Sequence, residues 1–244
     1  MSALLEIKNL WGGYTEGVDI LRGIDVEVQQ GEAVGIIGLN GSGKSTLGKA
    51  VMNMIPIRRG KILFDGEDIA ALKTYELSRR GIAIMQQGGK VFPNLSVWDN
   101  LQLAAQASNS KFNIQNSELG EIIPLLQQSK RELQHHMADK LSGGQQHQLS
   151  LAMTLATGSR FVVLDEPSAG LSPKATEEMY TILRACRERL NLTIVLIEQN
   201  IAKALEFCDY SIVLQQGYIN SIVQKNKAVA EIKELLFNTK NTIK

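Results

Sequence analysis

Apolar residues in this chain gather in short runs separated by glycine-rich or polar segments. Ala33–Ile37 and Phe161–Asp165 contain almost only apolar residues and glycine, and a third such run covers 192–197. Runs of this length are typical of strands buried on both faces of a sheet. Residues 4–10 and 23–28 instead alternate between apolar and polar positions. This alternation predicts two half-buried strands that pair antiparallel.

Further strands and helices are predicted around these runs. The additional strands cover 61–64, 81–85, 211–214 and 218–223, and the last two form a hairpin around a Gln-Gly turn. The predicted helices cover 47–54, 74–80, a segment that starts at Val97 after the cap residue Ser96, 118–128 with an interruption near Pro124, 173–190 and 227–237. Residues 108–117 are polar and predict a loop. This order of elements predicts an α/β fold.

The segment 38–46 reads GLNGSGKST and matches the phosphate-loop pattern G-x-x-x-x-G-K-[ST]. It lies between a predicted buried strand and a predicted helix, which is the context that the pattern requires. Glycines let the backbone amides approach an anion, and the helix N-terminus adds partial positive charge. Lys44 can reach the β- and γ-phosphates, and the Ser45 hydroxyl can bind Mg²⁺. The candidate nucleotide-binding residues here are Gly38, Asn40, Gly41, Ser42, Gly43, Lys44, Ser45 and Thr46.

Two adjacent carboxylates, Asp165 and Glu166, stand at the C-terminal end of the predicted strand Phe161–Asp165. Asp165 can hold Mg²⁺, while Glu166 can polarise a water molecule toward the γ-phosphate. The polar segment 86–89 (QQGG) ends another predicted strand. Ligands bind at this edge in open α/β sheets, so the segment is a candidate for ligand contact.

Between Phe92 and Lys140 the pattern changes to helices without a strong strand signal, which predicts an inserted helical region. Directly after it, LSGGQQ places Ser142 and Gln145 in capping-box register before a helix to about residue 157. On these residues alone, the segment is either a second anion site or only a well-capped helix. His135, His136 and His147 lack the spacing of metal ligands, and we expect them on a solvated face.

Composition narrows the possible partners and the compartment. The 244 residues are 44% hydrophobic and carry 26 Lys+Arg against 25 Asp+Glu, so no basic excess points to nucleic acid or to a charged membrane surface. No apolar run approaches the ~20 residues that span a bilayer, and the N-terminus does not resemble a signal peptide. Cys186 and Cys208 are far apart, which suits a reducing compartment. We therefore expect a cytosolic protein.

The segments GLNGSGKST, LSGGQQ and FVVLDEP, in this order, resemble the nucleotide-binding subunit of ABC transporters over nearly the whole chain. The resemblance implies a P-loop NTPase (RecA-like) core with an N-terminal antiparallel β subdomain and an inserted helical subdomain. In a single ABC domain of residues 1–244, the core and β subdomain would comprise 1–90 and 158–244, and the helical signature subdomain 91–157. It also implies an ATPase whose cofactors are ATP and Mg²⁺.

The family pattern assigns roles to particular positions. It implies a head-to-tail dimer with a second, homologous ATP-binding subunit, in which each ATP lies between 38–46 of one subunit and 142–145 of the other. Tyr14 would stack on adenine, Gln87 would contact Mg²⁺ or water and couple to the permease, and Gln199 would occupy the switch position. The implied nucleotide contacts of the signature are Ser142, Gly143, Gly144 and Gln145. The transmembrane permease would hold the chain on the inner face of the cell membrane, without any nucleic-acid partner.

Finer features of the sequence point to one branch of the family. VFPNLSVWDNL, DEPSAGLSP and IVLIEQN resemble the LivF-type ATP-binding subunit of branched-chain amino acid importers, with urea importer subunits close behind. Gln199 and Ser172 depart from the wider family but fit this branch, whereas Met153 departs from both and Gln87 is closer to the urea type. An ATP-hydrolysing motor of an importer is the favoured hypothesis. The alternatives are a degenerate cassette that relies on an active partner, and a soluble ABC ATPase of translation or DNA repair.

Overall fold

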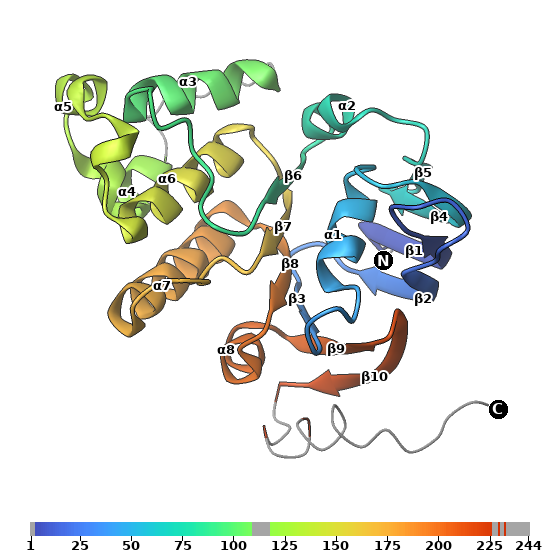
Figure 1. Ribbon diagram of the computed structural model, residues 1–244. Coiled ribbons are helices and arrows are strands. Elements are labelled where there is room, and N and C mark those ends of the chain that lie inside the picture. The colour runs from blue at the N-terminus through green and yellow to red at the C-terminus, as the bar shows by residue number, and fades with distance from the viewer. Residues whose placement is uncertain (1–2, 109–117, 226–228, 230–231, 233–244) are drawn as a thin grey trace. The chain divides into compact units, whose positions relative to one another are not determined.

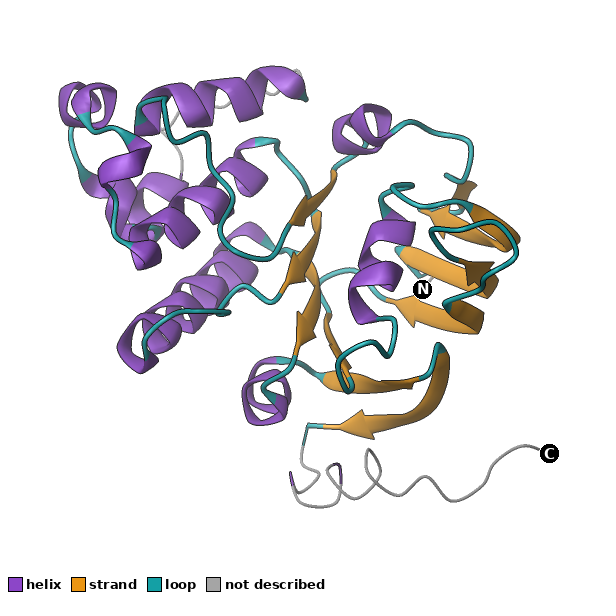
Figure 2. Ribbon diagram, viewed as in Figure 1, coloured by secondary structure: helices purple, strands orange, loops and turns teal. Residues whose placement is uncertain are grey.

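A computed structural model describes residues 3–108, 118–225, 229 and 232. The chain forms two compact units, one of Met1–Ala71 with Val195–Lys244 and one of Leu72–Ile194. Both contain strands and helices, as Figures 1 and 2 show. The helix predicted at 227–237 and most of the loop predicted at 108–117 lie outside the described residues. The subdomain boundaries at 90/91 and 157/158 stay a prediction.

A four-stranded antiparallel sheet with the order β2-β1-β4-β5 belongs to the first unit. Leu5 of β1 pairs with Val28 of β2 and Ile7 with Val26, and all four side chains are buried. Alternation of apolar and polar residues thus places one face of the pair on a core, and the predicted antiparallel pair is confirmed. The strands are β1 (Leu5–Gly12), β2 (Leu21–Val28), β4 (Ile57–Phe64) and β5 (Glu67–Asp68).

The same unit contains a second group of strands in the order β10-β9-β3. The strand β3 (Ala33–Ile37) is buried throughout and runs parallel to β9 (Tyr210–Gln215), which turns at Gln216-Gly217 into β10 (Tyr218–Gln224). Both turn residues have positive φ (48° and 85°), so the predicted hairpin is confirmed. Helices α1 (Lys44–Val51) and α8 (Ile201–Phe207) also belong to this unit, and Ala204 and Leu205 of α8 pack against Ile37 and Val213.

The second unit places helices around the parallel pair β6 (Ile82–Met85) and β7 (Phe161–Asp165). Helices α3 and α5 pack together, and α3 also packs on α6 (Figure 1). The helices are α2 (Thr74–Arg79), α3 (Val97–Ala107), α4 (Glu118–Ile122), η2 (Pro124–Gln127), α5 (Lys130–His135), η3 (Ala138–Lys140), α6 (Gly143–Ala156) and α7 (Pro173–Leu190). The boundary between the units cuts β8 (Thr193–Glu198).

Most predicted elements are present, with two differences that matter for the site. The helix predicted at 47–54 begins at Lys44 and ends at Val51, so Lys44 and Ser45 form its first turn. The strand predicted at 4–10 extends to Gly12, so Trp11 lies in β1. Ser96 caps α3, and Pro124 interrupts the helix 118–128 as predicted. Within the described part of the chain, none of the helices has the length and apolar character of a membrane span.

Candidate nucleotide site

The phosphate loop connects β3 to α1 in the first unit. Gly41 and Gly43 have φ of 77° and 103°, a region that side-chain-bearing residues adopt only under strain. The Ser42 amide donates to Leu39 O over 3.1 Å, and the Gly217 amide donates to Ser42 O over 2.9 Å. These bonds fix the loop on the β9–β10 turn, while the first turn of α1 contains no acidic residue that would oppose an anion.

Lys44 is only 5% exposed and folds back over this loop. Its Nζ donates to the carbonyl oxygens of Gly38, at 2.9 Å, and Leu39, at 3.0 Å. A buried ammonium group is stable only with such partners, and phosphate oxygens are stronger acceptors than carbonyls. The lysine is thus held at the loop where a nucleotide phosphate can bind.

The two aromatic residues Trp11 and Tyr14 lie in different surroundings. The Trp11 Nε1–H donates to Asn9 Oδ1 over 2.9 Å, and Arg59 lies 5.2 Å from the Trp11 ring centre, so this ring packs on the sheet. Tyr14 is 50% exposed, and Lys49 Nζ of α1 lies 5.4 Å from the centre of its ring. A ring that is fixed in this way and exposed can stack on a base.

In the second unit, β7 ends in the two predicted carboxylates. Asp165 and Glu166 are 5% and 7% exposed, and Glu166 has a φ of 50°. Gln87 follows β6, and its Nε2 donates to Glu166 Oε2 over 2.5 Å. The structure therefore brings Gln87 to the candidate general base. A buried carboxylate on a left-handed backbone is unfavourable for stability, and such residues concentrate at functional sites.

The signature segment forms the N-terminus of α6, and its predicted capping box is confirmed. The Gln145 amide donates to Ser142 Oγ over 3.3 Å, and the Ser142 amide donates to Gln145 Oε1 over 3.0 Å. Gly143 and Gly144 bring no bulky side chain to this helix end, and the first turn contains no acidic residue. The arrangement suits an anion that approaches along the helix axis.

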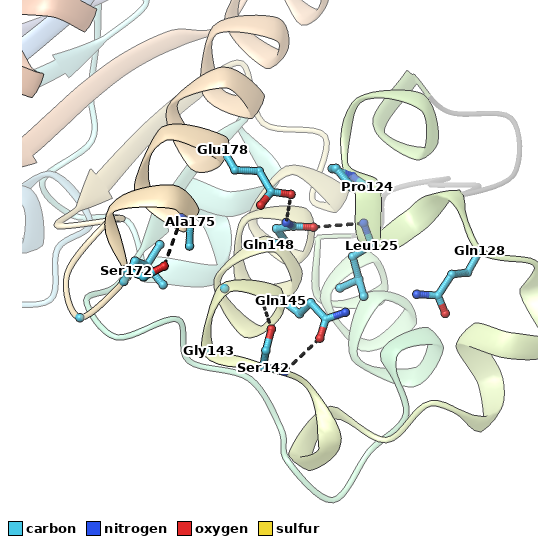
Figure 3. A pocket seen from close by; sticks show the side chains of 13 residues that line it. Pro124, Leu125, Gln128, Ser142, Gly143, Gln145, Gln148, Ser172, Ala175 and Glu178 are labelled. Atoms are coloured by element: carbon cyan, nitrogen blue, oxygen red, sulfur yellow. Dashed lines mark hydrogen bonds between the residues drawn. The ribbon is translucent and has the colours of Figure 1, made fainter.

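A pocket of about 660 Å³ opens beside this helix end (Figure 3). Gln148 fixes one wall, because its Oε1 accepts from the Leu125 amide over 3.1 Å and its Nε2 donates to Glu178 Oε1 over 3.2 Å. The lining residues are Pro124, Leu125, Gln128, Ser142, Gly143, Gly144, Gln145, Gln148, Gly170, Leu171, Ser172, Ala175 and Glu178. The structure thus brings the signature residues together with Gly170–Ser172, the segment that leads into α7.

Ser172 explains one departure from the family pattern. It is the N-cap of α7, where its Oγ accepts from the Ala175 amide over 3.3 Å and Pro173 occupies the first turn. Serine and aspartate are both preferred N-caps, so either residue can start this helix. Met153, the other departure in this unit, is half-buried on α6.

Gln199 belongs to the first unit and follows β8. Its side chain is exposed, and the next residue, Asn200, caps α8 by accepting from the Lys203 amide over 3.2 Å. The sequence pattern did not predict α8, which fixes the backbone directly after Gln199. Gln199, the switch position, therefore lies between the end of the buried strand β8 and the start of α8.

His147 contradicts the expected solvated face. It is only 7% exposed, because α6 carries it toward Gly89. His135 is exposed and His136 half-buried. Residues 3–108 and 118–225 contain no group of three His, Cys, Asp or Glu side chains that could hold a metal ion.

Comparison with known proteins agrees with these motifs. A family model described as "ABC transporter" matches residues 21–169. The probable branched-chain amino acid transport protein LivF of Archaeoglobus fulgidus is 33% identical over 88% of this chain and 90% of its own length. The Pseudomonas aeruginosa high-affinity branched-chain amino acid transport protein BraG is 32% identical over 84% and 87%. The lipopolysaccharide export protein LptB of Escherichia coli K12 is 31% identical over 89% of each.

Solved structures agree on the fold. The cbiO1 protein of Clostridium perfringens, part of the ABC transporter complex cbiONQ, has a TM-score of 0.80 at 26% identity, covering 96% of this chain and 93% of its own. The P-loop core, antiparallel β sheet and helical region expected from the sequence are therefore confirmed as the ABC ATPase fold. The chain belongs to the ABC transporter family and is an ATP-binding subunit of a transporter, with ATPase activity.

Proposed function

We propose that this chain energises an importer of branched-chain or other hydrophobic amino acids. The supporting observation is the 33% identity to an A. fulgidus LivF protein over 88% of the chain. The subunit would form a head-to-tail dimer with a second ATP-binding subunit, bind permease subunits and reach the inner face of the membrane only through them. ATP binding would close the dimer and hydrolysis would reopen it.

Nucleotide binding is assigned to the residues whose local geometry suits it. Lys44 and the amides of 38–46 would bind the phosphates, and Tyr14 would stack on adenine. The hydroxyl of Ser45, the carboxylate of Asp165 and the amide oxygen of Gln87 are the hard oxygen donors that Mg²⁺ prefers, so these residues fit the ion. Bound Mg²⁺ would neutralise charge that develops on the phosphates.

Hydrolysis would depend on Glu166 as the general base. Its buried carboxylate can accept a proton from water, and the bond from Gln87 Nε2 orients Oε2. Gln199 would donate a hydrogen bond from its amide to a γ-phosphate oxygen, a role that needs no change of protonation. Ser142, Gly143, Gly144 and Gln145 would meet the γ-phosphate of the ATP that the other subunit binds, through the amides at the start of α6.

Export of lipopolysaccharide is the second candidate function. It is supported by the E. coli LptB protein, which is 31% identical over 89% of this chain. Transport of urea is a further alternative, since Gln87 differs from the LivF-type residue. A degenerate cassette is another, since Met153 replaces the usual signature-helix arginine and Gln199 replaces the usual switch histidine.

Reconstitution separates these functions. The chain would be purified with the permease subunits and the solute-binding protein of a branched-chain amino acid importer and placed in liposomes. We expect leucine-loaded binding protein to stimulate ATP hydrolysis, and urea to have no effect. Stimulation by urea, or by lipopolysaccharide with an export permease, would reject the amino acid assignment. Absence of hydrolysis in every complete assembly would instead favour the degenerate cassette.

A further inference from the structure

His147 is buried in the first half of α6, directly behind the signature glycines. Its Nδ1 lies 2.9 Å from the carbonyl oxygen of Gly143. Because a carbonyl oxygen only accepts, Nδ1 carries the proton and donates it in this bond. The ring therefore ties itself to the first residue of the helix whose N-terminus forms the candidate anion site.

The opposite nitrogen of the ring has no such bond. Nε2 is buried, and no hydrogen-bond partner for it lies among the residues that the structure describes. A buried polar atom without a partner disfavours folding. Folding stability therefore does not account for a histidine at position 147. The contacts of the ring are the remaining explanation.

The His147 ring contacts Gly89, which is distant from it in the sequence. A Cβ added at Gly89 would lie 2.8 Å from Nδ1 and 2.9 Å from Cγ of His147. The ring thus occupies the space that a side chain at Gly89 would need. Gly89 also has a φ of 56°, which other residues adopt only under strain. A ring packed against bare backbone follows any displacement of that backbone.

Gly89 continues the segment of Gln87, whose Nε2 donates to Glu166 Oε2. His147 therefore lies in a chain of contacts from the signature carbonyl of Gly143, through Gly89 and Gln87, to Glu166. All these residues belong to the unit Leu72–Ile194.

We propose that His147 is a positioning residue that couples the signature helix to the candidate general base. When the partner's nucleotide binds at the start of α6, the ring holds Gly89 in place, and Gln87 holds the Glu166 carboxylate. This inference rests on the proposed roles of Ser142–Gln145, Gln87 and Glu166. It assigns His147 no contact with nucleotide.

His135 provides a matched control. Its Nδ1 lies 2.7 Å from Arg131 O, the same bond to the residue four positions earlier, but the side chain is exposed on α5. His135→Ala removes an equivalent local bond without touching the segment 86–89. Any larger effect of His147→Ala then comes from its surroundings and not from the loss of one helix bond.

The test is a double-mutant cycle on single-turnover hydrolysis of Mg²⁺-ATP by the complete ATP-binding dimer. We expect His147→Ala to lower the rate about tenfold at saturating ATP, with ATP affinity of the isolated chain within about twofold of wild type. In a Gln87→Ala background, His147→Ala should have almost no further effect. His135→Ala should leave the rate unchanged in both backgrounds.

The inference would be overturned if His147→Ala lowered the rate by the same factor in the wild-type and Gln87→Ala chains. It would also be overturned if His147→Ala did not lower the rate, or if it lowered ATP affinity as much as the rate. His147→Asn keeps an N–H donor for Gly143 O but lacks the ring edge at Gly89, and it replaces the alanine variant if circular dichroism shows that variant unfolded. Its rate should fall in the same way, and a wild-type rate would reject the coupling. Glu166→Gln measured in parallel separates the two proposals. If it hydrolyses normally, the proposed general-base role of Glu166 fails, and the inference fails with it. A blocked Glu166→Gln with unaffected His147 variants rejects only the inference.

Discussion

Glu166 is the residue at which stability and the proposed chemistry conflict most clearly. Its carboxylate is 7% exposed and its φ is 50°. Glu166→Gln keeps the size, and its carbonyl oxygen can still accept from Gln87 Nε2. The variant removes only the proton acceptor, so we expect hydrolysis to fall by about 10²–10⁴-fold while ATP stays bound in a persistent dimer.

Single-turnover hydrolysis beside size-exclusion chromatography with ATP measures both effects. Glu188→Gln, an exposed change on α7, is the control and should behave as wild type. Undiminished hydrolysis in Glu166→Gln would remove the general-base assignment.

Gln199 tests the complementary role. An amide can donate a hydrogen bond to a phosphate oxygen but cannot usefully take a proton from water. We therefore expect Gln199→Ala to slow single-turnover hydrolysis less than Glu166→Gln does, and Gln199→His to be tolerated. The same assay compares the three variants, and a larger loss in Gln199→Ala than in Glu166→Gln would contradict this division of roles.

Both cysteines should be unreactive in the folded chain. Burial raises the pKa of the Cys186 thiol to about 12, and Cys208 is fully buried. Only the thiolate is a nucleophile, so the Cys186 reaction with a disulfide reagent should stay slow at pH 7–9 and appear on unfolding. Spectroscopic thiol titration with and without denaturant measures this. Fast native reaction at pH 8 would show that the thiols are accessible.

Local patterns predict single residues well when the cause is local. The Ser142 cap follows from S-x-x-Q spacing, and the positive φ of Gly41 and Gly43 follows from the phosphate-loop pattern. His147 was predicted wrongly because its burial depends on Gly89, which is distant in sequence and contacts the ring only in the folded unit. No pattern within α6 carries that information.

At the scale of elements, the signature helix offers a second test. Ser142→Ala removes the acceptor for the Gln145 amide, which costs ~1 kcal/mol at the helix start. Since this end should meet the partner's nucleotide, we expect ATP-dependent dimerisation to suffer more than ATP binding by the monomer. Isothermal titration calorimetry and size-exclusion chromatography measure the two quantities.

The control for this change is another capping box. Ser129 and Glu132 make the same reciprocal bonds at the start of α5. Ser129→Ala should cost similar stability and leave dimerisation intact. If both serine variants weaken the dimer equally, lost helix stability explains the result and not a contact with the partner's nucleotide.

Elements were predictable where the pattern has clear ends. Buried strands β3 and β7 match their predicted bounds, because glycine or acidic residues end each apolar run. Helices α5 and α8 were missed, since six and seven residues are too few to show a helical period. The start of α1 was placed too late because the glycine-rich loop hides the first turn, which contains Lys44 and Ser45.

For the whole molecule, the residues alone predicted the α/β class, while the ABC architecture and the dimer came from resemblance. The helical segment from Phe92 to Lys140 is distinct in sequence because it lacks strand runs. A subunit that binds nucleotide between two copies leaves part of its site on another chain, and no pattern in one chain displays that. The pairing of subunits must therefore be tested with whole chains.

Mixing two defective chains tests this pairing. Lys44→Ala removes a cation from the phosphate loop and should weaken ATP binding by ~1.5–3 kcal/mol. Ser142→Ala should impair the signature segment, which would contact the ATP bound by the other subunit. In a head-to-tail dimer of two copies, a mixed dimer has one site with both defects and one intact site. Random mixing should then restore about a quarter of the wild-type sites.

Single-turnover hydrolysis of each variant and of the equimolar mixture measures this recovery. A mixture no more active than the mean of its components would reject a head-to-tail dimer of identical chains. The same measurement with the second ATP-binding subunit of the transporter then shows whether two different chains pair. If this chain pairs only with that different subunit, two copies of this chain never share a site. Adding the Ser142→Ala chain should then restore no activity to the Lys44→Ala chain.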